Sequence, residues 1–134
     1  MTERILSAAQ RAVSILIKQG KTVASAESCT GGLLSAALTA IPGASAVIGL
    51  GVCSYSIEIK NKILGVSMET LSEFGAVSRE TAAEMAECVR RLADADIAVS
   101  VTGSAGPEPA EGKAPGTVYI GISDSSETKV EKLE

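Results

Sequence analysis

Two glycine-containing turns carry most of the residues that could perform chemistry. The segment SCTGG at 28–32 follows one apolar stretch, and the segment TGSAGP at 102–107 follows another. Where strands of an α/β sheet end in such turns, backbone N–H groups and helix N-termini favour anions, and small hydroxyl side chains add donors. The two turns therefore predict a cradle for a phosphate or carboxylate with a nucleophile beside it. The alternative is two tight turns that need glycine only for positive φ angles.

The absence of histidine limits which groups could act as a base. A Ser-His-Asp triad, a Cys-His dyad and a His-ligated zinc site are excluded for this chain alone. Tyr55 and Lys60 lie at the end of an apolar segment and inside the helical pattern that follows it. A lysine in a low-dielectric cleft has a lowered pKa, so a Ser–Lys or Ser–Lys–Tyr arrangement with Ser28 is the simplest way to activate a hydroxyl. The alternative is a solvated Lys60 beside Lys62, with the Tyr55 ring in the core.

The three cysteines offer a rival nucleophile. Cys29 precedes a predicted helix, whose N-terminus can lower a thiol pKa, but lone cysteines among small residues more often serve packing, so we rank it below Ser28. Cys53, in a predicted buried strand, and Cys88, in the longest predicted helix after Ser78, are interpreted as structural. An odd number of cysteines without a CxxC motif argues against a disulfide framework and favours a reducing, cytoplasmic location.

Three glutamates lie near these turns. Glu27 stands at the mouth of the first turn. It could bind a ligand hydroxyl, orient Lys60 or accept hydrogen bonds from backbone amides. Glu108 and Glu111 fall in a polar, proline-containing segment that we interpret as an exposed loop, and we assign them no role.

The periodicity of apolar residues predicts the elements that position these groups. Helices are expected at 5–17, 33–40, 56–64 and 69–74 and after Ser78, and strands at 22–27, 47–55, 97–102, 116–123 and 128–133. Thr2 and Gly20 are expected to bound the first helix, and Ser78 to cap the longest one. Helices that alternate with short apolar strands predict an α/β fold with a mixed sheet.

Length and composition narrow the class of protein. A chain of 134 residues with 46% hydrophobic residues suits one folded domain. Lys plus Arg is 12 and Asp plus Glu is 16, a net charge of −4, which argues against binding to nucleic acid or to an anionic membrane. The sequence has no apolar run long enough to span a bilayer and no signal-peptide core at its start, so we expect a cytoplasmic protein.

The motifs taken together resemble the CinA C-terminal domain family, the nicotinamide-nucleotide amidases. The resemblance is carried, in order and spacing, by AESCTGG at 26–32, Tyr55-Ser56 with Lys60, LGV at 64–66, GAVS at 75–78, TGSAGP at 102–107 and GTV at 116–118. It implies a three-layer α/β/α sandwich with a mixed, mostly parallel sheet and a homo-oligomer, a dimer or larger. It also implies hydrolysis of nicotinamide mononucleotide to nicotinate mononucleotide and ammonia, with no cofactor and no metal.

The resemblance also assigns residues to the site. Its catalytic group maps onto Ser28, Tyr55, Lys60 and Thr102. Lys60, assisted by Tyr55, would take the proton of Ser28, while amides of the first turn and the Thr102 hydroxyl stabilise the oxyanion. The substrate is expected to contact residues of both turns: Glu27, Cys29, Thr30, Gly31, Gly32, Gly103, Ser104 and Gly106.

The chain departs from the family pattern at two places. Ile57 stands where the family usually has Asn, and the Gly-Asp-Arg segment and closing helix that usually follow the last strand are not found before residue 134. We therefore expect residues 1–134 to form a single CinA C-terminal-like domain that is truncated at its C-terminus. The departures also leave open a second interpretation, a catalytically reduced module that binds pyridine nucleotides.

Overall fold

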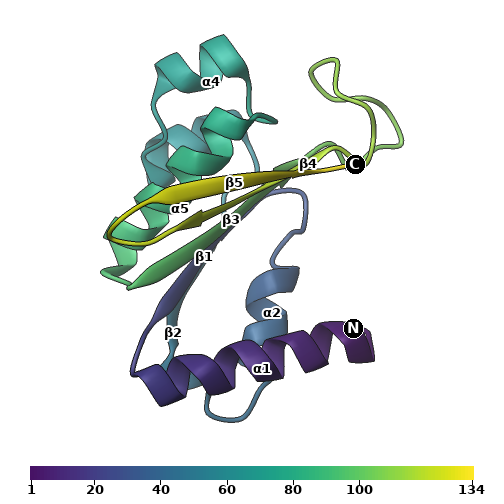
Figure 1. Cartoon of the computed structure of the whole chain (residues 1–134). Coiled ribbons are helices and arrows are strands. Elements are labelled where there is room, and N and C mark those ends of the chain that lie inside the picture. The colour runs from purple at the N-terminus through teal and green to yellow at the C-terminus, as the bar shows by residue number, and fades with distance from the viewer.

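The computed structural model describes all 134 residues, and it places helices on both faces of a five-stranded sheet (Figure 1). The strands are β1 (Val23–Glu27), β2 (Ile48–Cys53), β3 (Ile97–Gly103), β4 (Val118–Ser123) and β5 (Thr128–Leu133). The helices are α1 (Glu3–Gln19), α2 (Leu33–Thr39), α3 (Ile57–Ile59), α4 (Met68–Phe74) and α5 (Arg79–Ala93), with a 3₁₀ turn η1 (Ala44–Ala46) and a π turn η2 (Lys60–Leu64). Each predicted element is present, with ends that differ by a few residues.

The strand order brings the two glycine turns to the same edge of the sheet. The order is β2-β1-β3-β4-β5, with β1 parallel to both β2 and β3. β4 runs antiparallel to β3 and to β5. Because β1, β2 and β3 are parallel, the segments that leave their carboxyl ends lie next to one another. The predicted α/β class with a mixed sheet is confirmed.

Side chains from β1 face both helical layers. Val23 packs in a core with α1 and α2, whereas Ala24 and Ala26 pack in a second core with α5. In Figure 1, α1 and α2 lie on one side of the sheet and α4 and α5 on the other. The small residues Ala24, Ala26 and Ala98 let α5 approach the sheet closely, and this fixes the segment that precedes α5 above the carboxyl ends of the strands.

The caps of the two longest helices agree with the sequence-based prediction. Thr2 accepts a hydrogen bond from Ile5 N, Gly20 ends α1 with φ 65°, and Ser78 accepts from Thr81 N at the start of α5. The prediction that β2 is buried is wrong, because β2 is an edge strand of alternating partial exposure. Cys53 at its end is consequently exposed, whereas Cys88 is buried. No helix is both long and apolar enough to cross a membrane.

Candidate active site

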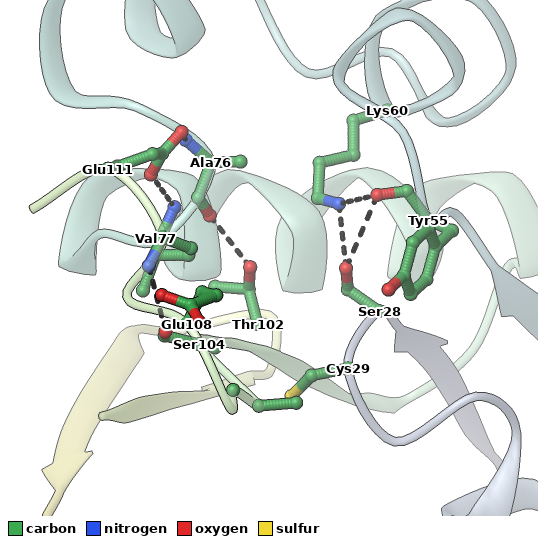
Figure 2. Close-up of a pocket in the computed structure, with 14 residues that line it drawn as sticks. Ser28, Cys29, Tyr55, Lys60, Ala76, Val77, Thr102, Ser104, Glu108 and Glu111 are labelled. Carbon is green, nitrogen blue, oxygen red and sulfur yellow. Dashed lines mark hydrogen bonds between the residues drawn. The ribbon is translucent and has the colours of Figure 1, made fainter. Parts of the chain in front are cut away.

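A cavity of about 280 Å³ lies between the two glycine turns, at the carboxyl edge of the parallel strands. It includes all residues that were predicted to be catalytic, together with residues from the segment before α5 and from the loop after β3. The lining residues are Ser28, Cys29, Tyr55, Lys60, Ala76, Val77, Thr102, Gly103, Ser104, Ala105, Gly106, Glu108, Ala110 and Glu111. Figure 2 shows Ser28, Tyr55 and Lys60 on one side of this cavity and Thr102, Ala76 and Glu111 on the other.

Lys60 and Ser28 form the polar centre of the cavity. Lys60 Nζ lies 2.9 Å from Ser28 Oγ, 2.7 Å from the carbonyl oxygen of Ser54 and 2.9 Å from that of Tyr55 (Figure 2). Only 1% of Lys60 and 7% of Ser28 is exposed. The alternative interpretation, a solvated Lys60, is therefore wrong, while the neighbouring Lys62 is exposed.

A local irregularity of the helix turns Lys60 inward. Ser56 caps α3 by accepting a hydrogen bond from Ile59 N, and the helix then widens into the π turn η2, which ends at Gly65 with φ 98°. Lys60 and Leu64, at the two ends of that turn, are both buried. Single π turns are frequent at functional sites, because they displace one side chain from the regular helical position. The sequence predicted a helix here but not this turn.

Burial controls the protonation of Lys60. It lowers the pKa of the Lys60 amine, because an ammonium group loses its hydration there, and no carboxylate forms an ion pair with it. A neutral amine can donate two hydrogen bonds, to the carbonyl groups of Ser54 and Tyr55, and accept one from Ser28 through its lone pair. The three observed contacts fit this form as well as they fit an ammonium group that donates to all three oxygens.

Tyr55 contributes its backbone carbonyl to this arrangement. That oxygen accepts from Lys60 at 2.9 Å and lies 3.5 Å from Ser28 Oγ. The interpretation that the ring packs in the core is wrong, since Tyr55 is 74% exposed and borders the cavity.

On the opposite wall, Thr102 and Ser104 are buried, and their hydroxyl groups already have protein partners. Thr102 Oγ1 donates to the carbonyl of Ala76 at 2.7 Å. Ser104 Oγ donates to the carbonyl of Lys113 at 3.3 Å and accepts from Ala110 N at 3.1 Å. A threonine hydroxyl that donates to a backbone carbonyl cannot donate to an oxyanion at the same time. The predicted donor role of Thr102 is therefore incompatible with this geometry.

Four predicted substrate-binding residues do not line the cavity: Glu27, Thr30, Gly31 and Gly32. Glu27 is 1% exposed and accepts hydrogen bonds from Thr30 Oγ1, Leu34 N, Ser35 N and Ser35 Oγ. Burial raises the pKa of Glu27, but these hydrogen bonds outweigh it and leave the pKa below its usual value. Glu27 thus fixes the start of α2, which is the backbone-amide alternative left open above. Gly31 and Gly32 have φ of 63° and 107° and make the turn that leads there.

Cys29 connects the two turns by packing. A Cβ at Gly103 would lie 3.1 Å from Cys29 Sγ and 2.8 Å from the carbonyl oxygen of Thr117. Only glycine therefore allows the end of β3 to pack this closely against Cys29 and Thr117. Burial raises the pKa of the Cys29 thiol, which disfavours a thiolate nucleophile. No group of three or more Cys, Asp or Glu side chains is arranged to hold a metal ion.

Two parts of the site were missed by sequence reasoning. Ser54 supplies a carbonyl oxygen to Lys60, a contact that depends on backbone direction and leaves no mark in the sequence. Glu111, to which we assigned no role, accepts hydrogen bonds from the backbone N–H groups of Ala76 and Val77, both at 2.8 Å. The glycine at position 75, directly before this pair, is the only signal that could have suggested it.

Comparison with known proteins now places this geometry in a family. The family model described as the CinA C-terminal domain matches residues 6–134. The chain belongs to the CinA family. A protein of Caldanaerobacter subterraneus named as a competence-damage inducible protein is 52% identical to this CinA domain over 122 residues, which is 90% of the present chain. A CinA-like protein of Endomicrobium trichonymphae is 53% identical over 116 residues, or 86% of the chain.

Solved structures agree with this assignment. The competence/damage inducible protein CihA of Agrobacterium tumefaciens is 38% identical and superposes on 99% of the CinA domain with a TM-score of 0.95. A CinA superfamily protein of Enterobacter cloacae is 40% identical, with a TM-score of 0.92 over 96% of the domain. The domain covers 82% and 76% of those two chains. It spans only 30% and 27% of the length of the two curated relatives described above.

Proposed function

We propose that this CinA domain hydrolyses the carboxamide of nicotinamide mononucleotide to nicotinate mononucleotide and ammonia. The observation that carries the proposal is the 2.9 Å contact between Lys60 Nζ and Ser28 Oγ, made by a lysine that is 1% exposed and has no carboxylate partner. In a chain without histidine, a buried amine beside a serine hydroxyl suits acyl transfer. The choice of substrate rests on the family resemblance.

In the first half of the proposed reaction, Ser28 becomes acylated. The neutral Lys60 amine takes the Ser28 proton while Ser28 Oγ forms a bond to the carboxamide carbon. The carbonyl groups of Ser54 and Tyr55 hold the amine in place throughout, because each accepts a hydrogen bond from it. The tetrahedral intermediate then collapses, the C–N bond breaks, and the Lys60 ammonium returns its proton to the leaving nitrogen. Ammonia departs and an ester with Ser28 remains.

In the second half, water replaces ammonia. Lys60 takes a proton from the water, whose oxygen bonds to the ester carbon. Collapse of this second intermediate breaks the bond to Ser28 Oγ, which recovers its proton from Lys60. The products are nicotinate mononucleotide and the free enzyme, and a single base serves both steps.

The oxyanion needs donors other than the Thr102 hydroxyl. We propose the backbone N–H of Cys29 as one donor, because Cys29 follows Ser28 directly, borders the cavity and makes no hydrogen bond to another backbone group through this N–H. Each donor of this kind is worth about 3–4 kcal/mol in proteases. We propose the segment 103–106, which borders the cavity, for the nucleotide phosphate. A pyridine nucleotide as the partner and a homo-oligomeric state remain predictions.

Ammonia release from nicotinamide mononucleotide tests the proposal directly. We expect Ser28→Ala and Lys60→Met each to lower kcat/KM by about 10²–10⁴-fold, the range typical of a lost acid–base group. Lys62→Met is the matched control, because it removes the same group two residues away on the exposed surface. Full activity in both site variants would contradict the assigned roles. Full loss in Cys29→Ala, with activity retained in Ser28→Ala, would instead support a thiol nucleophile.

The second candidate is the non-catalytic module, which has one observation in its favour. Thr102 and Glu27, both assigned to the site by resemblance, are committed to protein contacts. This candidate predicts a rise of Tm in nicotinamide mononucleotide without formation of product. Product that accumulates over a long incubation, and that depends on Ser28, excludes it.

A further inference from the structure

The loop between β3 and β4 forms much of one cavity wall but has few anchors. Its base is held by hydrogen bonds from Gly116 N to Ser104 O (2.7 Å) and from Ser104 N to Thr117 O (2.9 Å). Within residues 105–115, the only hydrogen bonds that reach outside the segment 104–117 are those of the Glu111 side chain. Glu111 therefore supplies the only hydrogen bonds that join residues 105–115 to the rest of the molecule beyond the base of the loop.

The segment before α5 is shaped to receive that carboxylate. Glu111 Oε2 accepts from Ala76 N and Oε1 from Val77 N, both at 2.8 Å, so each oxygen has its own donor. A Cβ at Gly75 would lie 2.7 Å from Glu111 Oε1, and Gly75 has φ 83°. A side chain at position 75 would therefore displace the carboxylate. The N-terminus of α5 begins just beyond this segment, where negative charge is favoured.

The same segment is bonded to the end of β3. The Ala76 carbonyl accepts the Thr102 hydroxyl at 2.7 Å, so one peptide group joins Glu111 to a residue at the floor of the cavity. In Figure 2, Glu111, Ala76 and Thr102 form a continuous chain of contacts that faces Ser28 and Lys60. Neither Ser28 nor Lys60 takes part in it.

We propose that Glu111 is a positioning residue that latches the 104–116 loop onto Ala76 and Val77 and so holds the substrate-facing wall of the cavity in place. This inference rests on the proposed function, because the wall matters for catalysis only if the cavity binds the substrate. A latched wall is ordered before the substrate arrives. An unlatched one has to be ordered at the expense of binding free energy, so the latch should act on KM more than on kcat.

Glu111→Gln and Glu108→Gln each remove one negative charge from the loop, so a comparison of the two separates loss of the latch from loss of charge. In Glu111→Gln, one oxygen can still accept, but the amide NH₂ faces the second backbone N–H and opposes the contact. Glu108→Gln is the matched control, since Glu108 lies in the same loop, borders the same cavity and makes no hydrogen bond. Lys113 is the only trypsin site within 104–116, so cleavage there reports release of the loop without any substrate.

We expect Glu111→Gln to raise the rate of trypsin cleavage after Lys113 by about tenfold, and to speed amide exchange at Ala76 and Val77, while Glu108→Gln matches the wild type in both. We expect KM to rise about tenfold in Glu111→Gln with kcat within about threefold. Equal cleavage and exchange in the two variants would overturn the latch. Faster cleavage with unchanged KM would overturn the positioning role. A wild-type protein that folds but releases no ammonia would overturn the proposed function, and the cleavage and exchange measurements would still decide the latch.

Discussion

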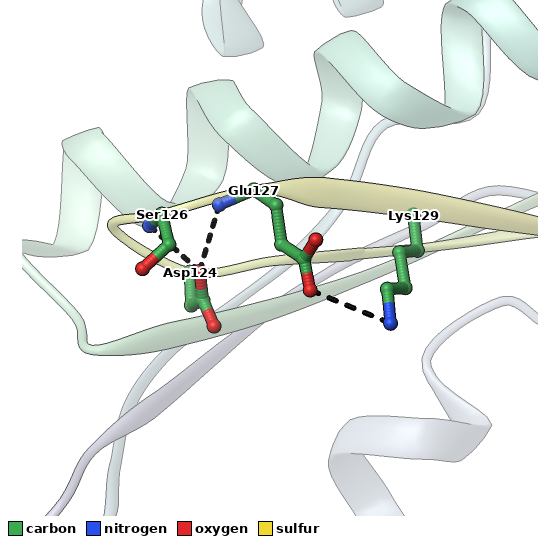
Figure 3. A network of polar contacts seen from close by, with 4 residues as sticks. All are labelled: Asp124, Ser126, Glu127 and Lys129. Atoms are coloured by element: carbon green, nitrogen blue, oxygen red, sulfur yellow. Dashed lines mark hydrogen bonds and ion pairs between the residues drawn. The ribbon is translucent and has the colours of Figure 1, made fainter.

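The cavity and the β4–β5 hairpin both contain short polar contacts, but they differ in access to water. In the cavity, Lys60 is 1% exposed and its amine lies 2.7–2.9 Å from three oxygen atoms. In the hairpin, Asp124 Oδ1 accepts from Ser126 N at 2.7 Å and from Glu127 N at 2.9 Å (Figure 3). Lys129 Nζ lies 3.4 Å from Glu127 Oε1, with side chains that are 75% and 60% exposed.

Burial, more than distance, decides what a polar contact can do in this molecule. Water competes for every group in the hairpin, so its contacts fix a turn and contribute little beyond it. At the cavity, Lys60 is almost completely shielded from water, and its pKa falls because the ammonium form is poorly solvated. Contacts of equal length can therefore give reactivity in one region and only local order in the other.

The largest effect that we expect from this difference is on the pH dependence of turnover. Lys60 acts as a base only when neutral, and burial places its pKa below the ordinary 10.5 of lysine. Below that lowered pKa, the neutral fraction rises about tenfold per pH unit, so kcat/KM should rise with the same slope and level off above it. Measured profiles of ammonia release from pH 5 to 10 check this. A flat profile, or one that falls as pH rises, would contradict a lysine base.

The free energy of unfolding should also depend on pH through Lys60. In the window between the lowered pKa of folded Lys60 and 10.5, the unfolded chain binds more protons than the folded one, so stability should rise with pH. Lys60→Met should lack this rise, whereas Lys62→Met should retain it. Urea unfolding at several pH values distinguishes the two variants.

A second and smaller effect is expected at Glu27, the buried counterpart of Asp124. Each of the two oxygens of Glu27 accepts two hydrogen bonds. In Glu27→Gln, an amide NH₂ would face the N–H and hydroxyl groups of Ser35, which donate to Oε2 in the wild type. We expect a loss of about 2 kcal/mol, or roughly 6–10 °C in Tm, at neutral pH. The pKa of folded Glu27 lies below 4.5, so the difference from wild type should shrink as pH falls from 4.5 through this lowered pKa. An unchanged Tm at pH 7 would show that the carboxylate is not needed.

Sequence patterns predicted the fold because its elements are governed by local rules. Apolar periodicity and the caps at Thr2 and Ser78 depend on residues a few positions apart. The order of the strands was not predicted, because β2 and β3 are joined by residues 54–96 and β1 lies between them in the sheet. The approach of Ser28 to Lys60 follows from the parallel pairing of β1 with β2. The error at β2 has a physical cause, since an apolar run does not reveal whether a strand has one neighbour or two.

Predictions of individual site residues were less accurate, because the type of a residue does not determine which partner it hydrogen-bonds. Thr102 borders the cavity as expected, but its hydroxyl donates a hydrogen bond to the carbonyl oxygen of Ala76. Tyr55 contacts Lys60 through its carbonyl, which any residue could supply. Glu111 acts through backbone N–H groups of a segment more than thirty residues away, and nothing in the local sequence pairs the two.

The smallest effect on stability is expected from Asp124→Asn in the β4–β5 hairpin. Asp124 accepts both of its backbone hydrogen bonds through Oδ1 alone, so Asp124→Asn can keep both contacts with its amide oxygen, and its NH₂ can turn to water. The lowered pKa of Asp124, caused by the N–H groups of Glu127 and Ser126, belongs to an exposed group whose charge is screened. We expect Tm to change by no more than about 2 °C and ammonia release to stay at the wild-type rate. The same carboxylate-to-amide change would then be costly at Glu27 and nearly silent at Asp124. Equal losses at both sites would mean that burial does not set the cost of this change.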